Sequence, residues 1–309
     1  MTSRRVLIST SSFGVADTSP LERLEREGFE VSLNPHGRVL TEDEIAALIA
    51  EVDGLIAGTE PLSDRVLAEA SRLRVISRVG VGIERIDLEA AERRGVQVFI
   101  TPDALTDAVA EITIGAMLTL LRGIHQMNTA LHDGRWEKSM GQLLRGKTVG
   151  IVGLGRIGKA VALLLAPFGV RRIARDEEPD HAWASANGVE FMPLRDLLAQ
   201  AEIATVHASG RECLIGPEEL ELLPDGALVL NAARGGLVDE AALYGAVSSG
   251  KLAGCYLDTF ELEPYEGPLR ELPNALLTPH AGSYAREARV RMESEAVENL
   301  LLGLRGDGR

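Results

Sequence analysis

Cysteine is scarce in this sequence of 309 residues, which has only Cys213 and Cys255, far apart and outside any Cys-x-x-Cys spacing. The count predicts neither a disulfide framework nor a zinc site, and it is typical of a protein in a reducing cytoplasm. The six histidines are scattered without the spacing of metal ligands. We therefore expect no bound metal.

Long apolar runs and an excess of basic residues are also missing. No hydrophobic segment reaches the length of a membrane-spanning helix, and residues 1–5 lead directly into a strand-like VLIST. We therefore expect neither a membrane segment nor a signal peptide. The 46 acidic residues outnumber the 32 basic ones, for a formal net charge of −14. Because phosphate backbones are bound by basic surfaces, we expect no nucleic-acid partner.

What the sequence has instead is a regular alternation of short apolar runs with amphipathic segments. Such alternation predicts βαβ units and parallel sheets, and the length is sufficient for two domains. Helix starts are predicted at two capping boxes, Ser19 to Glu22 and Thr41 to Glu44. A small-residue helix is predicted from about Thr106 to Gly123, buried between domains or subunits, and an amphipathic helix from Tyr284 to Leu304.

The stretch VGIVGLGRIGKA contains Gly153, Gly155 and Gly158 in the pattern G-x-G-x-x-G, after an apolar strand and before a helix. An acidic residue, Asp176, follows 18 positions after the last of these glycines, at the end of the next predicted strand. The combination is the fingerprint of dinucleotide binding, in which the helix N-terminus holds the pyrophosphate. Asp176 would accept hydrogen bonds from a ribose diol and repel a 2′-phosphate, which favours NAD over NADP.

NADP stays as the less favoured alternative because two arginines, Arg172 and Arg175, precede Asp176 and could hold a 2′-phosphate. A simple structural turn is the competing interpretation of the glycines, and the strand, helix and acidic residue around them weigh against it.

Three apolar runs downstream end in polar residues that could carry chemistry: Arg234 in NAARGGLVDE, Glu263 in LDTFELEP and His280 in LLTPHAG. Ligands of open α/β sheets bind beyond the carboxyl ends of strands. A histidine oriented by a carboxylate can deliver a proton to the oxygen of a 2-oxo acid, and an arginine can bind the substrate carboxylate and polarise its carbonyl. Taken singly, each of these residues also fits an ordinary structural role.

Together these segments resemble the family of D-isomer-specific 2-hydroxyacid dehydrogenases. The resemblance rests on GKTVGIVGLGRIGKAVA, NAARGGLVDEAAL, LAGCYLDTFELEP and LPNALLTPHAGS, and LHDGRWEKSMGQLLRGKT is most similar to the phosphoglycerate dehydrogenase branch. It implies two doubly wound parallel-sheet α/β domains, a flavodoxin-like substrate domain (1–101 and 283–309) and an inserted Rossmann NAD-binding domain (102–282), with cofactor and substrate between them. It also implies a homodimer.

The resemblance places catalytic roles on Arg234, Glu263 and His280, a nicotinamide contact on Asp258 and a ribose contact on Asp176. It implies substrate carboxylate binding through the backbone of Val79, Gly80, Val81 and Gly82, and Arg78 is a further candidate anion contact. The predicted cofactor-binding set is completed by Arg156, Ile157, His207, Ala232 and Ala233.

Two departures from the family pattern bear on ligand choice. The loop from His207 to Ile215 is short and lacks the usual prolines, which affects the adenine half of the cofactor site. Gly58 stands where many phosphoglycerate dehydrogenases place a phosphate-contacting arginine, and Lys138 lies near another basic phosphate position.

The sequence thus predicts an NAD-dependent D-2-hydroxyacid dehydrogenase, phosphoglycerate dehydrogenase-like, that acts on a small 2-oxo or 2-hydroxy acid. A glyoxylate or hydroxypyruvate reductase, or a reductase of a phosphorylated or phosphonate-bearing 2-oxo acid, remains as an alternative. The alternative of another class is a dinucleotide-sensing, corepressor-like binding protein.

Overall fold

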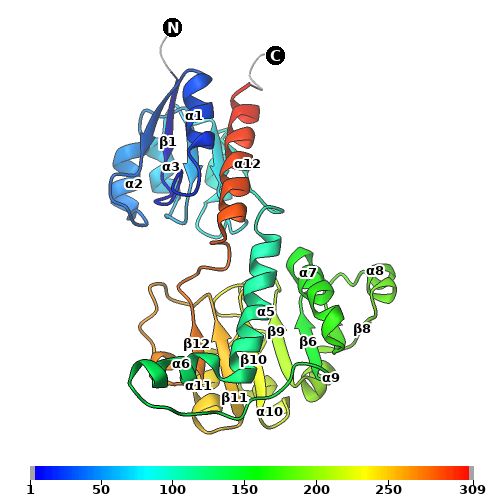
Figure 1. The fold of residues 1–309 in the computed structure, drawn as a ribbon. Helices are drawn as coiled ribbons and strands as arrows, with labels where there is room; N and C mark the ends of the chain where they lie inside the picture. Colours follow the sequence, from blue (N-terminus) through cyan, green and yellow to red (C-terminus); the bar gives the residue numbers. More distant parts are fainter. Residues whose placement is uncertain (1–3, 306–309) are drawn as a thin grey trace. The chain divides into compact units, whose positions relative to one another are not determined.

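The computed structural model describes residues 4–305 and divides them into two compact units. Unit 1 contains the described residues up to Leu105 and from Tyr284 onward, and unit 2 is the inserted segment Thr106–Ser283. Each unit is an α/β unit on a parallel sheet, five-stranded in unit 1 and seven-stranded in unit 2 (Figure 1). The predicted fold class of two parallel-sheet α/β domains, one inserted into the other, is confirmed.

The sheet of unit 1 has the strand order β2-β1-β3-β4-β5, so the winding direction changes between β1 and β3. The strands are β1 (Arg4–Ile8), β2 (Phe29–Leu33), β3 (Gly54–Ala57), β4 (Val75–Arg78) and β5 (Gln97–Phe99). The helices are α1 (Ser19–Arg26), α2 (Glu42–Ile49), α3 (Asp64–Glu69), α4 (Leu88–Arg93) and α12 (Arg286–Arg305).

Helices cover both faces of this sheet. On one face, α2, α3 and α4 bury Ile45, Val66 and Ala90 against Leu55 and Ile76 of the strands. On the other, α12 packs on β3, β4 and β5, and α1 packs beside α12. Because both faces are covered, the central strands β3 and β4 are buried along nearly their whole length, as is typical of parallel sheets.

The sheet of unit 2 has the order β12-β11-β10-β9-β6-β7-β8, with the change of direction between β6 and β9. The strands are β6 (Thr148–Val152), β7 (Arg171–Arg175), β8 (Val189–Phe191), β9 (Ile203–Val206), β10 (Ala227–Asn231), β11 (Leu252–Leu257) and β12 (Ala275–Leu277). The helices are α5 (Thr106–Arg122), α6 (Ile124–His132), α7 (Arg156–Leu165), α8 (His181–Ala186), α9 (Leu194–Gln200), α10 (Pro217–Leu222) and α11 (Glu240–Ser248), with short 3-10 turns η1 (Ala166–Phe168) and η2 (Pro268–Glu271).

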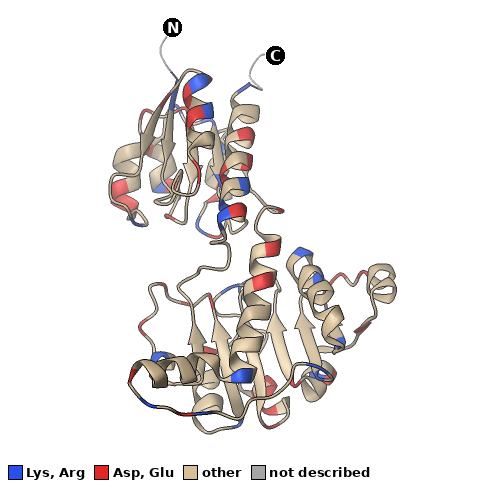
Figure 2. Cartoon of the chain, in the orientation of Figure 1, with Lys and Arg blue, Asp and Glu red and all other residues tan. Residues whose placement is uncertain are grey.

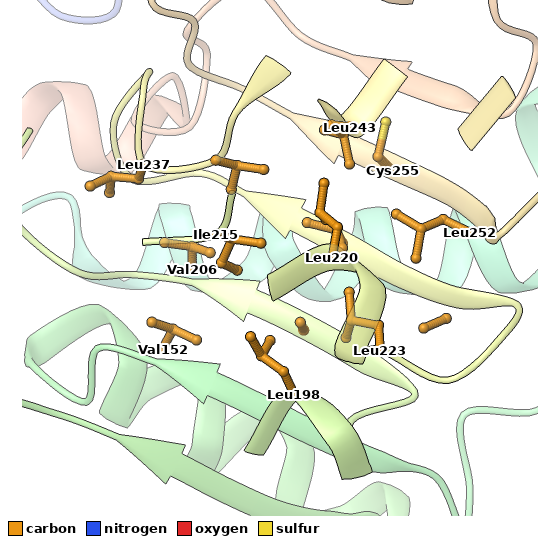
Figure 3. Close-up of a cluster of buried hydrophobic side chains, with 14 of the residues drawn as sticks. Val152, Leu198, Val206, Ile215, Leu220, Leu223, Leu237, Leu243, Leu252 and Cys255 are labelled. Atoms are coloured by element: carbon orange, nitrogen blue, oxygen red, sulfur yellow. The ribbon is translucent and has the colours of Figure 1, made fainter. Parts of the chain in front are cut away.

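The core of unit 2 lies where α9, α10 and α11 pack on the sheet. Figure 3 shows Val152 and Val206 of the strands facing Leu198, Leu220 and other aliphatic side chains of the helices. The opposite face is covered by α5 and α7, which pack against each other. This packing holds the carboxyl ends of the strands in fixed places, and those ends carry the predicted site.

Most predicted elements are present, with a few differences. The capping box at Thr41 and Glu44 forms with both hydrogen bonds. The predicted cap at Ser19 is wrong: Ser19 is the first residue of α1, its N–H donates to Asp17, and the N-cap is Thr18. Three elements of the structure, α6, α10 and β8, are not expected from the sequence.

Charges and membrane propensity complete the description of the fold. Acidic and basic side chains are interspersed over both units (Figure 2). Within residues 4–305, no single helix is both long and apolar enough to cross a bilayer. The pair α5 and α6 meets these criteria only when joined, and the two helices are bent by 67° at their junction. The same residues contain no group of three or more His, Cys, Asp or Glu side chains arranged to hold a metal ion.

Candidate active site

The glycine-rich turn follows β6, at the point where the sheet changes direction. Gly153 has a φ of +93°, and its N–H donates to the carbonyl of Arg175 at 2.8 Å. A Cβ at this position would lie 2.4 Å from the nitrogen of Ala208, so the left-handed conformation and the close approach both require glycine. The turn thereby ties together the ends of β6, β7 and β9.

Gly158 and Gly155, the other two glycines of the pattern, lack a side chain for different structural reasons. A Cβ at Gly158 would lie 2.1 Å from the carbonyl oxygen of Gly153, so this glycine lets α7 pack against the turn. A Cβ at Gly155 would meet no protein atom within 4 Å. Gly155 is the N-cap of α7 and supplies no side-chain hydrogen bond to the helix N-terminus. The open space and the N–H groups of the first helical turn fit the phosphates of a dinucleotide.

Asp176 follows β7 and lies beside this turn. Its carboxylate accepts hydrogen bonds from the N–H of Leu154 at 2.5 Å and the N–H of Glu178 at 3.0 Å. Each carboxylate oxygen can accept further hydrogen bonds, so a ribose diol remains a suitable partner. The structure thus brings together the glycines and the acidic residue of the predicted fingerprint.

The two arginines before Asp176 are differently placed. Arg172 donates from Nη1 to the carbonyl of Ala162 in α7, at 2.9 Å. Arg175 forms an ion pair with Glu177 at 3.7 Å, and the carboxylate of Glu177 is largely exposed. Both arginines therefore have partners within unit 2.

His207 follows β9 and is half-buried. Its Nε2 lies 2.9 Å from the hydroxyl of Thr205, and its Nδ1 is buried without a hydrogen-bond partner. Burial lowers the pKa of His207 to about 4, so the ring is neutral near pH 7. Of the other predicted cofactor contacts, Ala232 and Ala233 are buried at the end of β10, whereas Arg156 is exposed. Ile157 is half-buried in the first turn of α7.

The predicted catalytic residues follow three neighbouring strands, β10, β11 and β12. Nδ1 of His280 lies 2.9 Å from Oε2 and 3.1 Å from Oε1 of Glu263, and Oε1 also accepts a hydrogen bond from the N–H of Phe260 at 3.1 Å. Arg234 donates from Nη1 to the carbonyl of Ala233 at 2.8 Å. The structure thus pairs His280 with Glu263 and places Arg234 after the adjacent strand.

His280 itself has a φ of +51°, which is uncommon for a residue other than glycine. Two carbonyls hold its N–H, that of Asp258 at 2.8 Å and that of Thr278 at 3.0 Å. A non-glycine residue keeps this strained conformation only where the surrounding structure holds it in place. Such residues cluster at active sites.

Asp258 supports the loop that carries His280. Its buried carboxylate accepts hydrogen bonds from the hydroxyl of Thr278, from the N–H of Ala281 at 2.8 Å and from the N–H of Gly282 at 2.8 Å. In this structure the carboxylate of Asp258 therefore stabilises the backbone after His280. The nicotinamide contact assigned to it by family resemblance stays a prediction.

The predicted substrate loop lies in unit 1, after β4. The N–H of Val79 donates to the carbonyl of Ala57 at 3.0 Å, and the N–H of Gly80 donates to the hydroxyl of Thr101 at 2.8 Å. These two N–H groups therefore have partners inside unit 1. The contact of this loop with a substrate carboxylate stays a prediction.

Arg78 is folded over the same loop. Its Nε donates to the carbonyl of Gly82 at 3.1 Å, and its Nη1 donates to the carbonyl of Val79. A Cβ at Gly80 would lie 2.9 Å from Nη1 of this guanidinium. Arg78 thus shapes the loop from within.

Sequence reasoning missed a buried carboxylate after the end of β3. Glu60 is 2% exposed, and its Oε1 accepts hydrogen bonds from the hydroxyl of Ser9 and from the N–H of Gly58 at 3.1 Å. Burial raises the pKa of this carboxyl, opposed in part by the charge of Arg78. The signal available in the sequence was an acidic residue shortly after an apolar strand, which usually indicates only a solvated loop.

Comparison with known proteins decides the family. A family model described as the D-isomer specific 2-hydroxyacid dehydrogenase NAD binding domain matches residues 114–282. The chain belongs to this family. The match lies within unit 2, so unit 2 corresponds to the NAD binding domain of this family.

Two curated members of the family match much of the chain. The D-3-phosphoglycerate dehydrogenase of Methanocaldococcus jannaschii is 38% identical over 277 residues, which cover 87% of this chain and 53% of that protein. The glyoxylate reductase of Korarchaeum cryptofilum is 33% identical over 299 residues, which cover 93% of this chain and 90% of that protein. The chain thus spans about half the length of the phosphoglycerate dehydrogenases that it matches.

The crystal structure of the TT0316 protein from Thermus thermophilus is similar over nearly the whole chain. The TM-score is 0.90 at 37% sequence identity, over 98% of this chain and 97% of that one. The likeness covers both units, so unit 1 as well as unit 2 has a counterpart in this solved structure.

Proposed function

We propose that this chain is an NAD-dependent D-2-hydroxyacid dehydrogenase that interconverts a small 2-oxo acid and the corresponding 2-hydroxy acid. The observation that carries the proposal is the pair of His280 and Glu263, joined at 2.9 Å in the dinucleotide-binding unit. Arg234 follows the adjacent strand β10 and is assigned to the substrate.

The cofactor, when bound, supplies or accepts a hydride at nicotinamide, and the protein handles the proton. Because Nδ1 of His280 faces Glu263, Nε2 is the atom that donates the proton to the C2 oxygen of the 2-oxo acid. The contact of Nδ1 with the carboxylate of Glu263 orients the imidazole ring for this transfer. In the reverse direction, neutral His280 accepts the hydroxyl proton of the 2-hydroxy acid.

Binding of the substrate carboxylate is assigned to two groups of residues. The guanidinium of Arg234 binds the carboxylate and polarises the C2 carbonyl. In unit 1, the assignment is to the backbone N–H groups of Val81 and Gly82, with Arg78 shaping their loop. The roles of Val79 and Gly80 are then to hold this loop through their own hydrogen bonds.

NAD is the proposed cofactor, because the Asp176 carboxylate would repel a 2′-phosphate. Arg172, one of the two arginines that could accommodate NADP, donates instead to Ala162 of α7. A reducing, cytoplasmic location is part of the proposal and is supported by the free thiols of Cys213 and Cys255.

An unphosphorylated substrate such as glyoxylate or hydroxypyruvate is favoured by the surroundings of Gly58. Gly58 has no side chain to contact a phosphate, and a Cβ there would lie 2.8 Å from Oε2 of Glu60 and 3.1 Å from Cα of Thr10. Phosphohydroxypyruvate and phosphonopyruvate remain as alternative substrates to test.

The first test is NADH oxidation with these four 2-oxo acids, for the wild type and for Arg234→Ala, and a parallel series with NADPH. We expect turnover with NADH, and a fall in kcat/KM of about 10³-fold in Arg234→Ala, because one substitution removes a charge-assisted contact and the polarising group. The control is Arg195→Ala, which alters an exposed arginine of α9 and should change nothing.

Failure of the wild type to reduce any 2-oxo acid, with NADH bound at low micromolar concentration, would contradict the enzyme proposal. It would favour the dinucleotide-sensing binding protein. Turnover with NADPH in preference to NADH would overturn the choice of NAD while leaving the reaction in place.

We also propose a homodimer formed through α6 and the segment 133–146 that follows it. This surface exposes apolar side chains, with Trp136 82% and Met140 98% exposed, and Leu131 and Leu143 beside them in the sequence. Apolar groups exposed to this extent on one segment are typical of a surface that another protein covers.

The dimer is tested with the double substitution Trp136→Glu and Met140→Glu. Two carboxylates in an apolar interface should disrupt it, so the molar mass from light scattering should fall to that of one chain. Val15→Glu in unit 1, where the valine is 81% exposed, is the matched control and should leave the mass unchanged. A wild type that is already monomeric would contradict the proposal.

A further inference from the structure

Glu240 is an acidic residue next to the catalytic loops that the proposed reaction does not use. It is the first residue of α11, directly after the N-cap Asp239. Its Oε1 accepts a hydrogen bond from the backbone N–H of Glu261 at 2.6 Å. Since Glu261 lies in the loop after β11, this bond joins the start of α11 to the loop that carries Glu263.

Two consecutive backbone N–H groups of that loop donate hydrogen bonds to two different carboxylates. The N–H of Phe260 donates to Glu263, which in turn faces His280, and the N–H of Glu261 donates to Glu240. The side chain of Glu261 is exposed, so this residue takes part through its backbone. The peptide between Phe260 and Glu261 is therefore held from both sides.

The loop of Arg234 rests on the same peptide. A Cβ at Gly235 would lie 2.0 Å from the carbonyl carbon and oxygen of Phe260 and 2.4 Å from the nitrogen of Glu261. The ring of Tyr265 stacks on that of Phe260, with centroids 4.3 Å apart. Because the contact at Gly235 is backbone against backbone, a shift of the Phe260–Glu261 peptide would also displace the loop of Arg234.

The charges around Glu240 are mostly negative. Burial raises the pKa of its carboxyl, and the negative charges of Glu261, Asp239 and Glu263 raise it further. Tyr265 is a further titratable neighbour, and its pKa is raised as well, chiefly by burial. The N-terminus of α11 and the N–H of Glu261 are the groups that favour the charged form.

We propose that Glu240 is a positioning residue. It fixes the Phe260–Glu261 peptide and thereby holds Glu263 and Arg234 in the positions that catalysis needs. The proposal rests on the proposed dehydrogenase function. Glu240 needs no contact with substrate or cofactor, because its effect passes through one backbone hydrogen bond to Glu261 and one close contact at Gly235.

The test compares Glu240→Ala, which removes the acceptor, with Glu240→Gln, which keeps an amide oxygen in its place. We expect Glu240→Ala to lower kcat about 10- to 100-fold, since a small displacement of catalytic groups has effects of this size. Glu240→Gln should stay within about threefold of the wild type. The dissociation constant for NADH should be unchanged in both variants.

The split between kcat and KM separates positioning from a structural role. When Glu263 is misplaced it orients the His280 ring less well, so Glu240→Ala should lower kcat while KM for NADH stays within about threefold of the wild type. Glu266→Ala, which removes an exposed carboxylate of the same segment, is the matched control and should match the wild type. A Glu240→Ala variant with altered melting temperature but unchanged kcat would overturn the proposal. So would equal losses in the Ala and Gln variants.

A readout without turnover distinguishes this proposal from the proposed function. If the wild type reduces no 2-oxo acid, the dehydrogenase proposal fails, and hydrogen exchange of the Phe260 and Glu261 amides still tests the positioning. Exchange at least about 10-fold faster in Glu240→Ala than in Glu240→Gln would support it, because the opened loop exposes these amides. Equal exchange in the two variants would overturn it.

Discussion

His280→Asn is expected to lower kcat for reduction of a 2-oxo acid by about 10³-fold, within the range observed for loss of a general acid. The dissociation constant for NADH should stay within about twofold of the wild type, because the glycine turn and Asp176 lie after other strands of the sheet. Asparagine keeps a polar side chain and tolerates the positive φ of this position, so the fold should be retained.

The physical reason lies in the proton that must reach the C2 oxygen as the hydride arrives. Without His280 that proton has to come from water, which is a far weaker acid than an imidazolium. Glu263→Gln should give a smaller loss, about 10- to 100-fold, because the histidine remains but its imidazolium loses the carboxylate at 2.9 Å.

Steady-state kinetics and NADH titration measure both effects, and His36→Asn is the matched control. His36 is a half-exposed histidine of unit 1 that lies 3.6 Å from Glu44, so it also has a carboxylate neighbour. The assignment of His280 as the acid would be wrong if His280→Asn kept kcat within about tenfold of the wild type. Another group would then supply the proton.

Gly155→Ala is expected to weaken cofactor binding without changing stability, whereas Gly158→Ala is expected to lower stability. At Gly155 the new methyl group meets no protein atom, so the melting temperature of the free protein should not change. The methyl group would occupy the space assigned to the phosphates, and overpacking of about 1–3 kcal/mol raises the dissociation constant for NADH roughly 10- to 100-fold.

At Gly158 the added Cβ lies 2.1 Å from the carbonyl oxygen of Gly153, so α7 must move away from the turn. We expect a loss of about 2–4 kcal/mol in the free energy of unfolding, which corresponds to a fall of roughly 5–15 °C in melting temperature. Thermal unfolding without and with NADH measures both variants. A Gly155→Ala variant that binds NADH like the wild type would show that the phosphates lie elsewhere.

The sequence alone determined the class of fold, because the features that specify it are local. Apolar runs of strand length, amphipathic segments between them and the capping box at Thr41 all act within a few residues of themselves. Gly153, Gly158 and Asp176 were predictable for the same reason, since the turn and the strand end next to it require these residue types. The close resemblance of several motifs to one family then supplied the candidate catalytic residues.

Local signals were weak for the elements that the sequence did not predict. Strand β8 has only three residues, and α6 begins directly after Gly123, where a φ of +58° interrupts the helical pattern. The pattern at Ser19 correctly predicted the start of a helix. However, the backbone N–H of Ser19 donates to the carboxylate of Asp17, and the N-cap is Thr18. Neighbouring polar residues compete for the same N–H groups, and sequence does not decide between them.

Only the tertiary structure decided which polar groups meet. In the structure His280 contacts Glu263, and the carboxylate of Asp258 accepts a hydrogen bond from the N–H of Gly282. The carboxylate of Glu240 accepts a hydrogen bond from the N–H of Glu261. Each of these contacts joins residues 17 to 24 positions apart through loops at the ends of neighbouring strands. A hydrogen bond of this kind depends on where the packed sheet places its strand ends, and no periodicity of the chain records that position.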